Sequence, residues 1–175
     1  MKVFWARIPL EVGETYCAAT KKGLCFIGSP NESFEQLEKW VNHRIGTVAL
    51  IHEKRYLQPY LVQLNAYLRG EIEAFTIPID LHGTDFQRMI WEALCQIPYG
   101  QTTSYRALAQ IVGRPKAVRA VGNAVGANPL LYIVPCHRVV PTSGGLGGFR
   151  AGIALKEHLL TIEQESVGHG SWQNN

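Results

Sequence analysis

Residues 86–97 carry the pattern that most restricts the fold of this chain. Apolar side chains recur there at helical spacing, namely Phe86, Met89, Ile90, Ala93, Leu94 and Ile97. This spacing places them on one face of an amphipathic helix, which must pack against other elements. Thr84 and Gln87 predict a capping box at its start, and Pro98-Tyr99-Gly100 ends it. The second half of the chain is therefore predicted to be mainly helical.

Two shorter helices are predicted next. One begins at Thr103 or Ser104 and stops at Gly113, and the other runs from Pro115 to Asn128-Pro129. Their short connection is typical of a helix-turn-helix. The second helix is rich in small residues: Ala117, Ala120, Gly122, Ala124, Gly126 and Ala127. So thin a face fits either tight helix–helix packing or a helix lying in a narrow DNA groove, the minor one.

The first half of the chain predicts a small sheet with helices. Strands over 16–20 and 24–27 flank a hairpin turn at Lys21-Lys22-Gly23. A helix opens near Ser33, which would form a capping box with Gln36. A second helix spans about 57–68, with Pro59 in its first turn and Gly70 at its end. Residues 75–80 then read as a connecting strand or linker.

Charge is distributed unevenly over the 175 residues. Residues 1–81 hold nine Lys/Arg and nine Asp/Glu, whereas residues 82–163 hold eight against four, a net charge of +4. Such a bias in one half suits transient contact with phosphates, although many plain domains are as basic. Arg7 interrupts the apolar start, and no segment approaches membrane-spanning length. We expect a soluble cytoplasmic protein with no membrane partner.

Only one of the four cysteines has ionisable neighbours. Cys17 and Cys25 lie in strand-like apolar runs and Cys95 on an apolar helix face, so all three are expected to be buried. The spacings of Cys and His match no metal site, and we expect no metal. Cys136 instead lies in Pro135-Cys136-His137-Arg138-Val139. A thiolate is a strong nucleophile, and a nearby His can take the proton of the thiol.

The geometry of this pair depends on the backbone. The apolar run 130–134 would deliver Cys136 from the interior to a surface, and neighbouring side chains on a regular strand point to opposite faces. Cys136 and His137 would therefore meet only through a local bend or a bridging water. Taken alone, such a pair is more often structural than catalytic.

The motifs along the second half resemble those of the O6-alkylguanine-DNA alkyltransferases. The similarity rests on Pro135 to Val139, on 97–100 with Ser104-Tyr105, on 119–122, on Asn128-Pro129, and on Lys156-Glu157 with Leu159-Leu160 and Glu163. It covers residues 84–163, and residues 1–81 match more loosely as a companion domain. The resemblance implies an α/β protein with a ribonuclease H-like domain over 1–81. A mainly helical, winged-helix-like domain with a helix-turn-helix would follow over 82–165, then a flexible tail over 166–175.

The resemblance also implies the catalytic residues. Cys136 would accept the alkyl group, and His137 would take its proton through a water. Glu163 would orient His137. From the sequence alone, Glu163 is an exposed acid at the C-terminal end of a helix, where it opposes the helix dipole. No cofactor is implied, because the substrate brings its own leaving group.

The same family pattern implies a set of DNA- and base-binding residues. Tyr105 would help rotate the nucleotide out of the duplex, and Arg119 would enter the stack in place of the base. Asn128 would tie the recognition helix to the active-site strand. The carbonyls of Cys136 and Val139 would accept from the guanine amine. Phe149 and Arg150, in the glycine-rich loop, and Lys156, which would position that loop, complete the set. Phe149 is a departure, since many relatives have a tyrosine there that donates to the guanine O6.

These implications predict a DNA repair protein. It would bind duplex DNA through the minor groove as a monomer, flip O6-alkylguanine, and transfer the alkyl group once, irreversibly, to Cys136. Activity on O4-alkylthymine is left open. Two other classes remain as alternatives: a damage-binding protein without transfer activity, disfavoured by the presence of Cys136, and a helix-turn-helix regulator, disfavoured by the small residues of the second helix.

Overall fold

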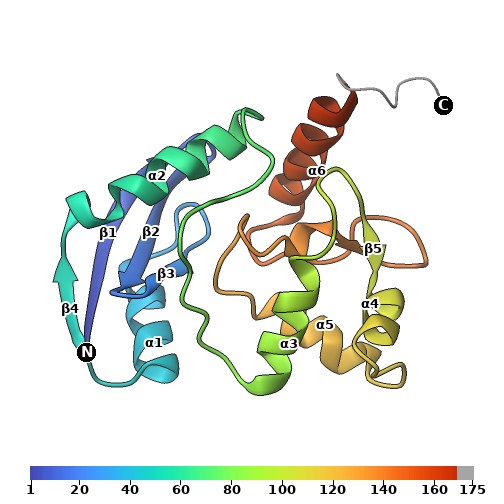
Figure 1. Ribbon diagram of the computed structural model, residues 1–175, viewed down its shortest axis with the longest axis horizontal. Helices are drawn as coiled ribbons and strands as arrows, with labels where there is room; N and C mark the ends of the chain where they lie inside the picture. The colour runs from blue at the N-terminus through green and yellow to red at the C-terminus, as the bar shows by residue number, and fades with distance from the viewer. Residues whose placement is uncertain (169–175) are drawn as a thin grey trace. The chain divides into compact units, whose positions relative to one another are not determined.

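The computed structural model describes residues 1–168, and these divide into two compact units. The first comprises residues 1–84 and 129–131, and the second comprises 85–128 and 132–168. The predicted α/β class is confirmed: the first unit holds a sheet with two helices, and the second is mainly helical (Figure 1). Within the described part of the chain, no helix is both long and apolar enough to cross a membrane.

The first unit is built on a four-stranded sheet of order β3-β2-β1-β4. The strands are β1 (Lys2–Leu10), β2 (Gly13–Thr20), β3 (Gly23–Ile27) and β4 (Ala49–His52). The first three are antiparallel neighbours, and β4 runs parallel to β1. The predicted hairpin is present, with Thr20 paired with Gly23 across the turn. The sequence analysis did not single out β1 or β4.

One helix covers each face of this sheet, because side chains on a strand alternate between faces. The helix α1 (Phe34–Arg44) packs on the face of Val3 and Trp5, with the Trp5 and Phe34 ring centroids 4.4 Å apart. The helix α2 (Lys54–Leu68) packs on the opposite face, where Tyr56 stacks on Phe4 at 4.1 Å. Alternation along a single strand thus supplies both halves of the core.

The helix α1 begins where predicted but without the predicted capping box, and α2 begins earlier than predicted. Ser33 is the N-cap of α1, but its side chain makes no cap hydrogen bond, and Gln36 donates its N–H to the Ser33 carbonyl. The helix α2 begins at Lys54, where the Glu53 side chain accepts from the Arg55 N–H. Pro59 is therefore inside the helix rather than in its first turn, and the Arg55 carbonyl loses its usual partner.

The outer edge of β3 is paired by two short segments from elsewhere in the chain. Leu24 donates to the Pro78 carbonyl at 3.0 Å and accepts from Asp80 at 2.8 Å, so part of the predicted linker 75–80 extends the sheet. Ile27 donates to Pro129 at 2.8 Å and bridges Leu130. A Cβ atom on Gly23 would lie 2.5 Å from the Pro78 carbonyl, so only glycine fits there.

The second unit contains four helices. They are α3 (Asp85–Leu94), α4 (Tyr105–Ile111), α5 (Val118–Gly126) and α6 (Ile153–Gly168). Two short parallel strands, β5 (Thr103–Ser104) and β6 (Val139–Val140), pair beside a 3₁₀ turn, η1 (Cys136–Arg138). Ile90 and Leu94 of the predicted apolar face of α3 are buried, whereas Phe86, Met89 and Ala93 are partly buried and the helix ends at Leu94. The indole N–H of Trp91 donates to the Ala124 carbonyl of α5 at 2.8 Å.

The predicted helix-turn-helix corresponds to α4 and α5. Ser104 caps α4 by accepting from the Ala107 N–H at 3.0 Å, and Gly113 follows its end with a φ of 73°. The helix α5 begins at Val118, three residues after the predicted start, because 114–117 form a turn. The last helix, α6, continues through 166–168, which the sequence analysis placed in the tail. Residues 169–175 of that predicted tail lie outside the described residues.

Candidate active site

Cys136 lies in a turn and not at the end of a strand. The apolar run 130–134 does not form a regular strand, since only Leu130 makes a bridge and 131–133 turn. The local bend that the sequence left open is therefore present. Tyr132 has a φ of 72°, an unusual backbone conformation for a non-glycine residue. Cys136, His137 and Arg138 then form the 3₁₀ turn η1. Successive side chains on such a turn point about 120° apart, so Cys136 and His137 do not point to opposite faces as they would on a regular strand.

His137 contacts the carboxylate predicted for it. Its Nε2 lies 2.8 Å from Oε1 of Glu163 on α6, and both side chains are fully buried. Glu163 is therefore not the exposed terminal acid that the sequence alone favours, and α6 continues beyond it to Gly168. Burial lowers the pKa of His137 despite the opposing effect of Glu163. The imidazole is therefore neutral at neutral pH and is able to accept a proton.

Arg138 is the functional residue whose contacts the sequence analysis missed. Its Nε and Nη2 donate to Glu163 at 2.7 to 3.1 Å, and its Nη1 donates to the Ile97 carbonyl at 2.7 Å. Hydrogen bonds from His137 and Arg138 outweigh the cost of burial and lower the pKa of Glu163 to about 2. Glu163 is a carboxylate across the physiological range. Two signals in the sequence could have predicted the contact between Arg138 and Glu163, namely an arginine directly after the Cys-His pair and an acid on the last helix.

The Cys136 thiol is 5% exposed and is protonated at rest. Burial raises its pKa above the ordinary value, while a hydrogen bond with Asn128 and the charges of Arg150 and Lys156 act in the opposite direction. A thiol of this kind needs a base before it becomes a nucleophile. The neutral imidazole of the next residue is the candidate for that base.

Asn128 connects the end of α5 to the segment before Cys136. Its side chain is 1% exposed, and its Nδ2 donates to the Val134 carbonyl at 2.8 Å. Its own carbonyl accepts from the Arg150 Nη2 at 3.2 Å. Asn128 therefore links the helix, the acceptor turn and the glycine-rich loop.

Lys156 connects α6 to the same loop. Its ammonium donates to the Val139 carbonyl at 2.6 Å and to the Gly148 carbonyl at 3.2 Å. The residue is 0% exposed, and burial lowers its pKa, with the nearby Cys136 opposing that shift. The ammonium thus fastens the loop beside the strand that follows Cys136.

Tyr105 lies between α5 and the glycine-rich loop. Its ring is 3.7 Å from the position of a Cβ on Gly122, and its hydroxyl is 3.6 Å from that of a Cβ on Gly147. Burial raises the pKa of its phenol, and the neighbouring Cys136 adds to the shift. Gly147 has a φ of 73°, and a Cβ there would approach Pro141 to 3.0 Å, so a side chain would displace the loop.

Arg119 lies apart from the buried cluster, exposed on α5. The exposed face of α5 consists of Arg119, Ala120, Asn123 and Gly126, while Val121, Ala124 and Val125 are buried. Only some of the predicted small residues therefore face outward. Phe149 is half-buried, and its carbonyl accepts from the Gly152 N–H at 3.0 Å. Its ring carries no donor.

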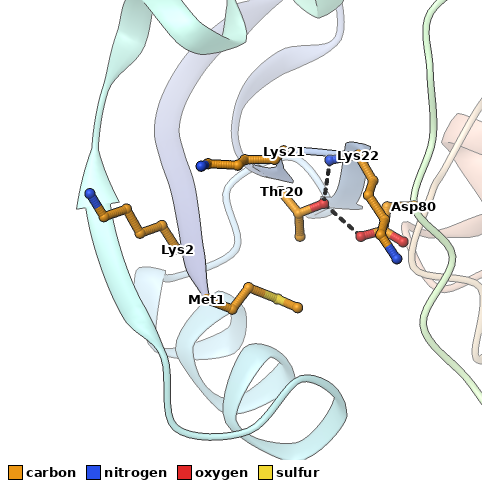
Figure 2. Close-up of a pocket in the computed structure, with 6 residues that line it drawn as sticks. All are labelled: Met1, Lys2, Thr20, Lys21, Lys22 and Asp80. Carbon is orange, nitrogen blue, oxygen red and sulfur yellow. Dashed lines mark hydrogen bonds between the residues drawn. The ribbon is translucent and has the colours of Figure 1, made fainter.

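The other three cysteines and a cavity of the first unit make none of the hydrogen bonds of the cluster around Cys136, although the charge of Arg138 acts on Cys95. Cys17 and Cys25 are buried as expected, but Cys95 is exposed because it follows the last residue of α3. A cavity of about 410 Å³ in the first unit is lined by Met1, Lys2, Thr20, Lys21, Lys22 and Asp80 (Figure 2). Among the described residues, no group of three His, Cys, Asp or Glu side chains is placed to hold a metal ion.

Both units match domains of one protein family. Residues 3–81 match the ribonuclease-like domain of 6-O-methylguanine DNA methyltransferase, and residues 85–165 match its DNA-binding domain. The chain therefore belongs to the 6-O-methylguanine DNA methyltransferase family. This confirms the resemblance drawn from the motifs around Cys136.

Individual relatives agree with this assignment. The chain is 43% identical over 164 residues to the inducible methylated-DNA–protein-cysteine methyltransferase of Bacillus subtilis, covering 94% of this chain and 92% of that protein. The chain is also 53% identical over 102 residues to the methylated-DNA–protein-cysteine methyltransferase of Mycobacterium bovis, covering 58% of this chain and 62% of that protein. The crystal structure of Mycobacterium tuberculosis OGT in complex with DNA matches with a TM-score of 0.78 and 36% identity, over 95% of this chain and 94% of that one.

Proposed function

We propose that this protein repairs DNA directly, by transferring the alkyl group of O6-alkylguanine to its own Cys136. The carrying observation is a buried thiol next to an imidazole that is hydrogen-bonded to a buried carboxylate, all within the matched DNA-binding domain. The relatives are named for methyl transfer from methylated DNA to a protein cysteine, and one was crystallised with DNA. Their names and this geometry support the same reaction.

The proton and electron balance of the transfer is simple. A water carries the Cys136 proton to His137, and Glu163 stabilises the imidazolium that forms. The thiolate then attacks the alkyl carbon, which forms a carbon–sulfur bond and breaks the carbon–O6 bond. The electron pair of the broken bond stays on the guanine, which takes the proton held by His137 and remains in the DNA. Because a thioether is not readily reversed, each molecule acts once.

In this proposal the helix α5 contacts the DNA. Its exposed face carries one long side chain, Arg119, among Ala120, Asn123 and Gly126, and so fits a narrow minor groove. We assign Arg119 to the space left by the flipped base, and Tyr105, beside Cys136, to rotating the nucleotide. Unstacking costs a few kcal/mol, which a side chain filling the gap offsets in part.

The flipped guanine would be held by the backbone of the acceptor turn. The carbonyls of Cys136 and Val139 accept from its exocyclic amine. Val139 already accepts from Lys156, but a carbonyl has two lone pairs and serves both donors. Lys156, Asn128 and Arg150 fix the surrounding loop, and backbone N–H groups near Phe149 stabilise the departing oxygen.

The remaining features of the proposal follow from the reaction. The substrate supplies the alkyl group and the leaving group, so the transfer requires no added cofactor. We place the protein in the cytoplasm with access to DNA, acting as a monomer. O4-alkylthymine, which carries an alkyl group on an equivalent oxygen, is a second possible substrate.

Intact-mass spectrometry after incubation with duplex DNA containing O6-methylguanine tests the proposal. We expect one methyl group per protein, mapped to Cys136, with no further turnover. Cys136→Ala should bind this DNA without gaining a methyl group, and Cys95→Ser should react like the unaltered protein. A protein that binds the lesion tightly and stays unmodified would instead be a damage-binding protein. Lesion-independent binding to one DNA sequence would indicate a regulator.

A further inference from the structure

The Glu163 carboxylate has two basic partners, and the proposed reaction uses only one of them. Oε1 accepts from His137 Nε2 at 2.8 Å and from Arg138 Nη2 at 2.7 Å, with the Arg138 Nε at 3.1 Å. Oε2 accepts from the same Nε at 3.0 Å and from the Gly100 N–H at 3.3 Å. The imidazole and the guanidinium therefore compete for one buried charge.

Arg138 is held firmly in this position. The residue is 7% exposed, its Nη1 donates to the Ile97 carbonyl at 2.7 Å, and its guanidinium carbon lies 5.6 Å from the centroid of the Tyr99 ring. The interaction of a guanidinium that forms two hydrogen bonds with one carboxylate is stronger and more directional than that of a compact ammonium group. The contacts of Arg138 thus fix the carboxylate in one orientation toward His137.

The charge balance around His137 gives this arrangement a chemical consequence. The charged groups facing the imidazole are Glu163 and Lys156 from α6 and Arg138 from its own turn, beside the Cys136 thiol. A buried carboxylate with the imidazole as its main partner would draw a proton onto the ring. An imidazolium cannot take the proton of a thiol. The permanent charge of Arg138 satisfies the carboxylate without that proton.

We propose that Arg138 is a positioning residue that binds the Glu163 carboxylate and so keeps His137 neutral and ready to accept the Cys136 proton. This inference rests on the proposed function, in which His137 is the base. It adds a requirement that the Cys-His-Glu arrangement does not contain, namely a second cation that balances the acid.

The first test is the titration of His137 in the free protein by NMR, with the ring signal assigned by its loss in His137→Gln. In Arg138→Gln we expect the midpoint to rise by about one pH unit or more, because an opposing cation has been removed. Arg138→Lys keeps the positive charge, so its His137 midpoint should lie close to that of the unaltered protein. Arg69→Gln is the matched control, since Arg69 makes a similar two-nitrogen contact to Glu71 on the exposed surface of the first unit.

The second test is the single-turnover rate of methyl transfer as a function of pH. For Arg138→Gln we expect the fall of the rate in acid to shift to higher pH together with the His137 midpoint. One pH unit below the raised midpoint, the rate should be about tenfold lower than its plateau at higher pH. An unshifted midpoint with an equal loss of rate at every pH would overturn the proposal and leave Arg138 a structural role. The NMR titration uses no DNA, so failure of methyl transfer in the unaltered protein would count against the proposed function alone.

A double variant covers the case in which Arg138→Gln does not fold. Arg138→Gln combined with Glu163→Gln removes both opposite charges and leaves no buried carboxylate to draw a proton. We expect its His137 midpoint to lie at or below that of the unaltered protein. A midpoint raised in this variant would contradict an action of Arg138 through Glu163.

Discussion

The ammonium group of Lys156 lies 2.6 Å from the carbonyl oxygen of Val139, and both residues are fully buried. The same ammonium reaches the Gly148 carbonyl at 3.2 Å. One side chain of α6 therefore holds the strand after Cys136 and the glycine-rich loop together.

Replacing Lys156 with Met should release this loop. Hydrogen bonds to a charged donor contribute about 1.5 to 3 kcal/mol, so we expect a loss of about 2 kcal/mol in the free energy of unfolding. Transfer should slow by more than the change in DNA affinity, measured by rapid quench and gel shift. Lys39→Met is the control, because Lys39 forms only an exposed pair with Glu35 and should change stability by less than about 0.5 kcal/mol. Equal effects from both variants would contradict the assignment.

Glu163 gives the protein a specific dependence on acid. Hydrogen bonds to His137 and Arg138 hold its folded pKa at about 2, below the ordinary 4.5, so its contribution is present above pH 4.5 and is lost as pH falls toward 2. A difference of this size corresponds to about 3 kcal/mol. We expect the stability gap between the unaltered protein and Glu163→Gln, measured by urea unfolding, to narrow by that amount over this range. A constant gap would mean that the carboxylate is not selectively stabilised. The variant should also methylate Cys136 more slowly with near-unchanged DNA affinity.

The exposed end of α5 offers a test of groove binding. No other residue lies within 4 Å of a Cβ built on Gly126, so a larger side chain fits the folded protein. Gly126→Gln should keep or slightly raise the stability, since glycine in a helix costs about 0.5–1 kcal/mol. If the helix enters a narrow groove, this variant should bind DNA at least tenfold more weakly, whereas Gly126→Ala should bind normally. Unchanged binding by Gly126→Gln would exclude close approach at this residue.

Arg119 should matter only when the damaged base is paired. Arg119→Ala removes the side chain proposed to fill the stack, so repair of duplex DNA should slow by about 10- to 100-fold, the equivalent of the few kcal/mol that unstacking costs. Transfer from the free base O6-methylguanine needs no flipping and should be nearly unaffected. The two rates are compared by intact mass over time. Similar losses on both substrates would remove the flipping role.

Phe149→Tyr tests the departure from the family pattern. A phenol at this position could donate to the guanine O6 as the carbon–oxygen bond breaks, and a hydrogen bond to developing charge contributes about 1.5 to 3 kcal/mol. We expect transfer to accelerate by about tenfold in single-turnover assays. A rate equal to that of the unaltered protein would indicate that backbone N–H groups already stabilise the leaving oxygen.

Periodic and local signals were sufficient for much of the fold. The face of α3, the Ser104 cap and the Lys21–Lys22 turn depend on neighbours within a few residues, which a sequence displays directly. The start of α2 at Lys54 was missed because Pro59 suggested a first turn, and tertiary packing on β1 overrides that preference. The strand β4 was missed because its burial pattern comes from its parallel pairing with β1.

The members of the candidate site were predicted mainly from the resemblance to family motifs. The residue pattern taken alone indicated fewer of them. The order of Cys136 and His137 is visible in the sequence, but their partner Glu163 is 26 residues away from His137 and reads as an exposed acid. The 3₁₀ turn was foreseen only as an unspecified local bend, and the positive φ of Tyr132 within an apolar run was not predicted. Arg138 gains its meaning only when α6 brings Glu163 against it.

Residues 129–131 belong to the first unit although the chain on both sides of them belongs to the second. No single cut of the chain can therefore yield both units whole. A fragment beginning at residue 85 would carry away the segment that pairs with Ile27, and the remaining fragment would expose that part of its sheet edge. If the second unit, which holds Cys136, is transferred to another scaffold, that scaffold must supply a strand edge with which residues 129–131 can pair in place of β3. The two matched domains are therefore not separable by cutting the chain, because residues 129–131 belong to the unit on the other side of the cut.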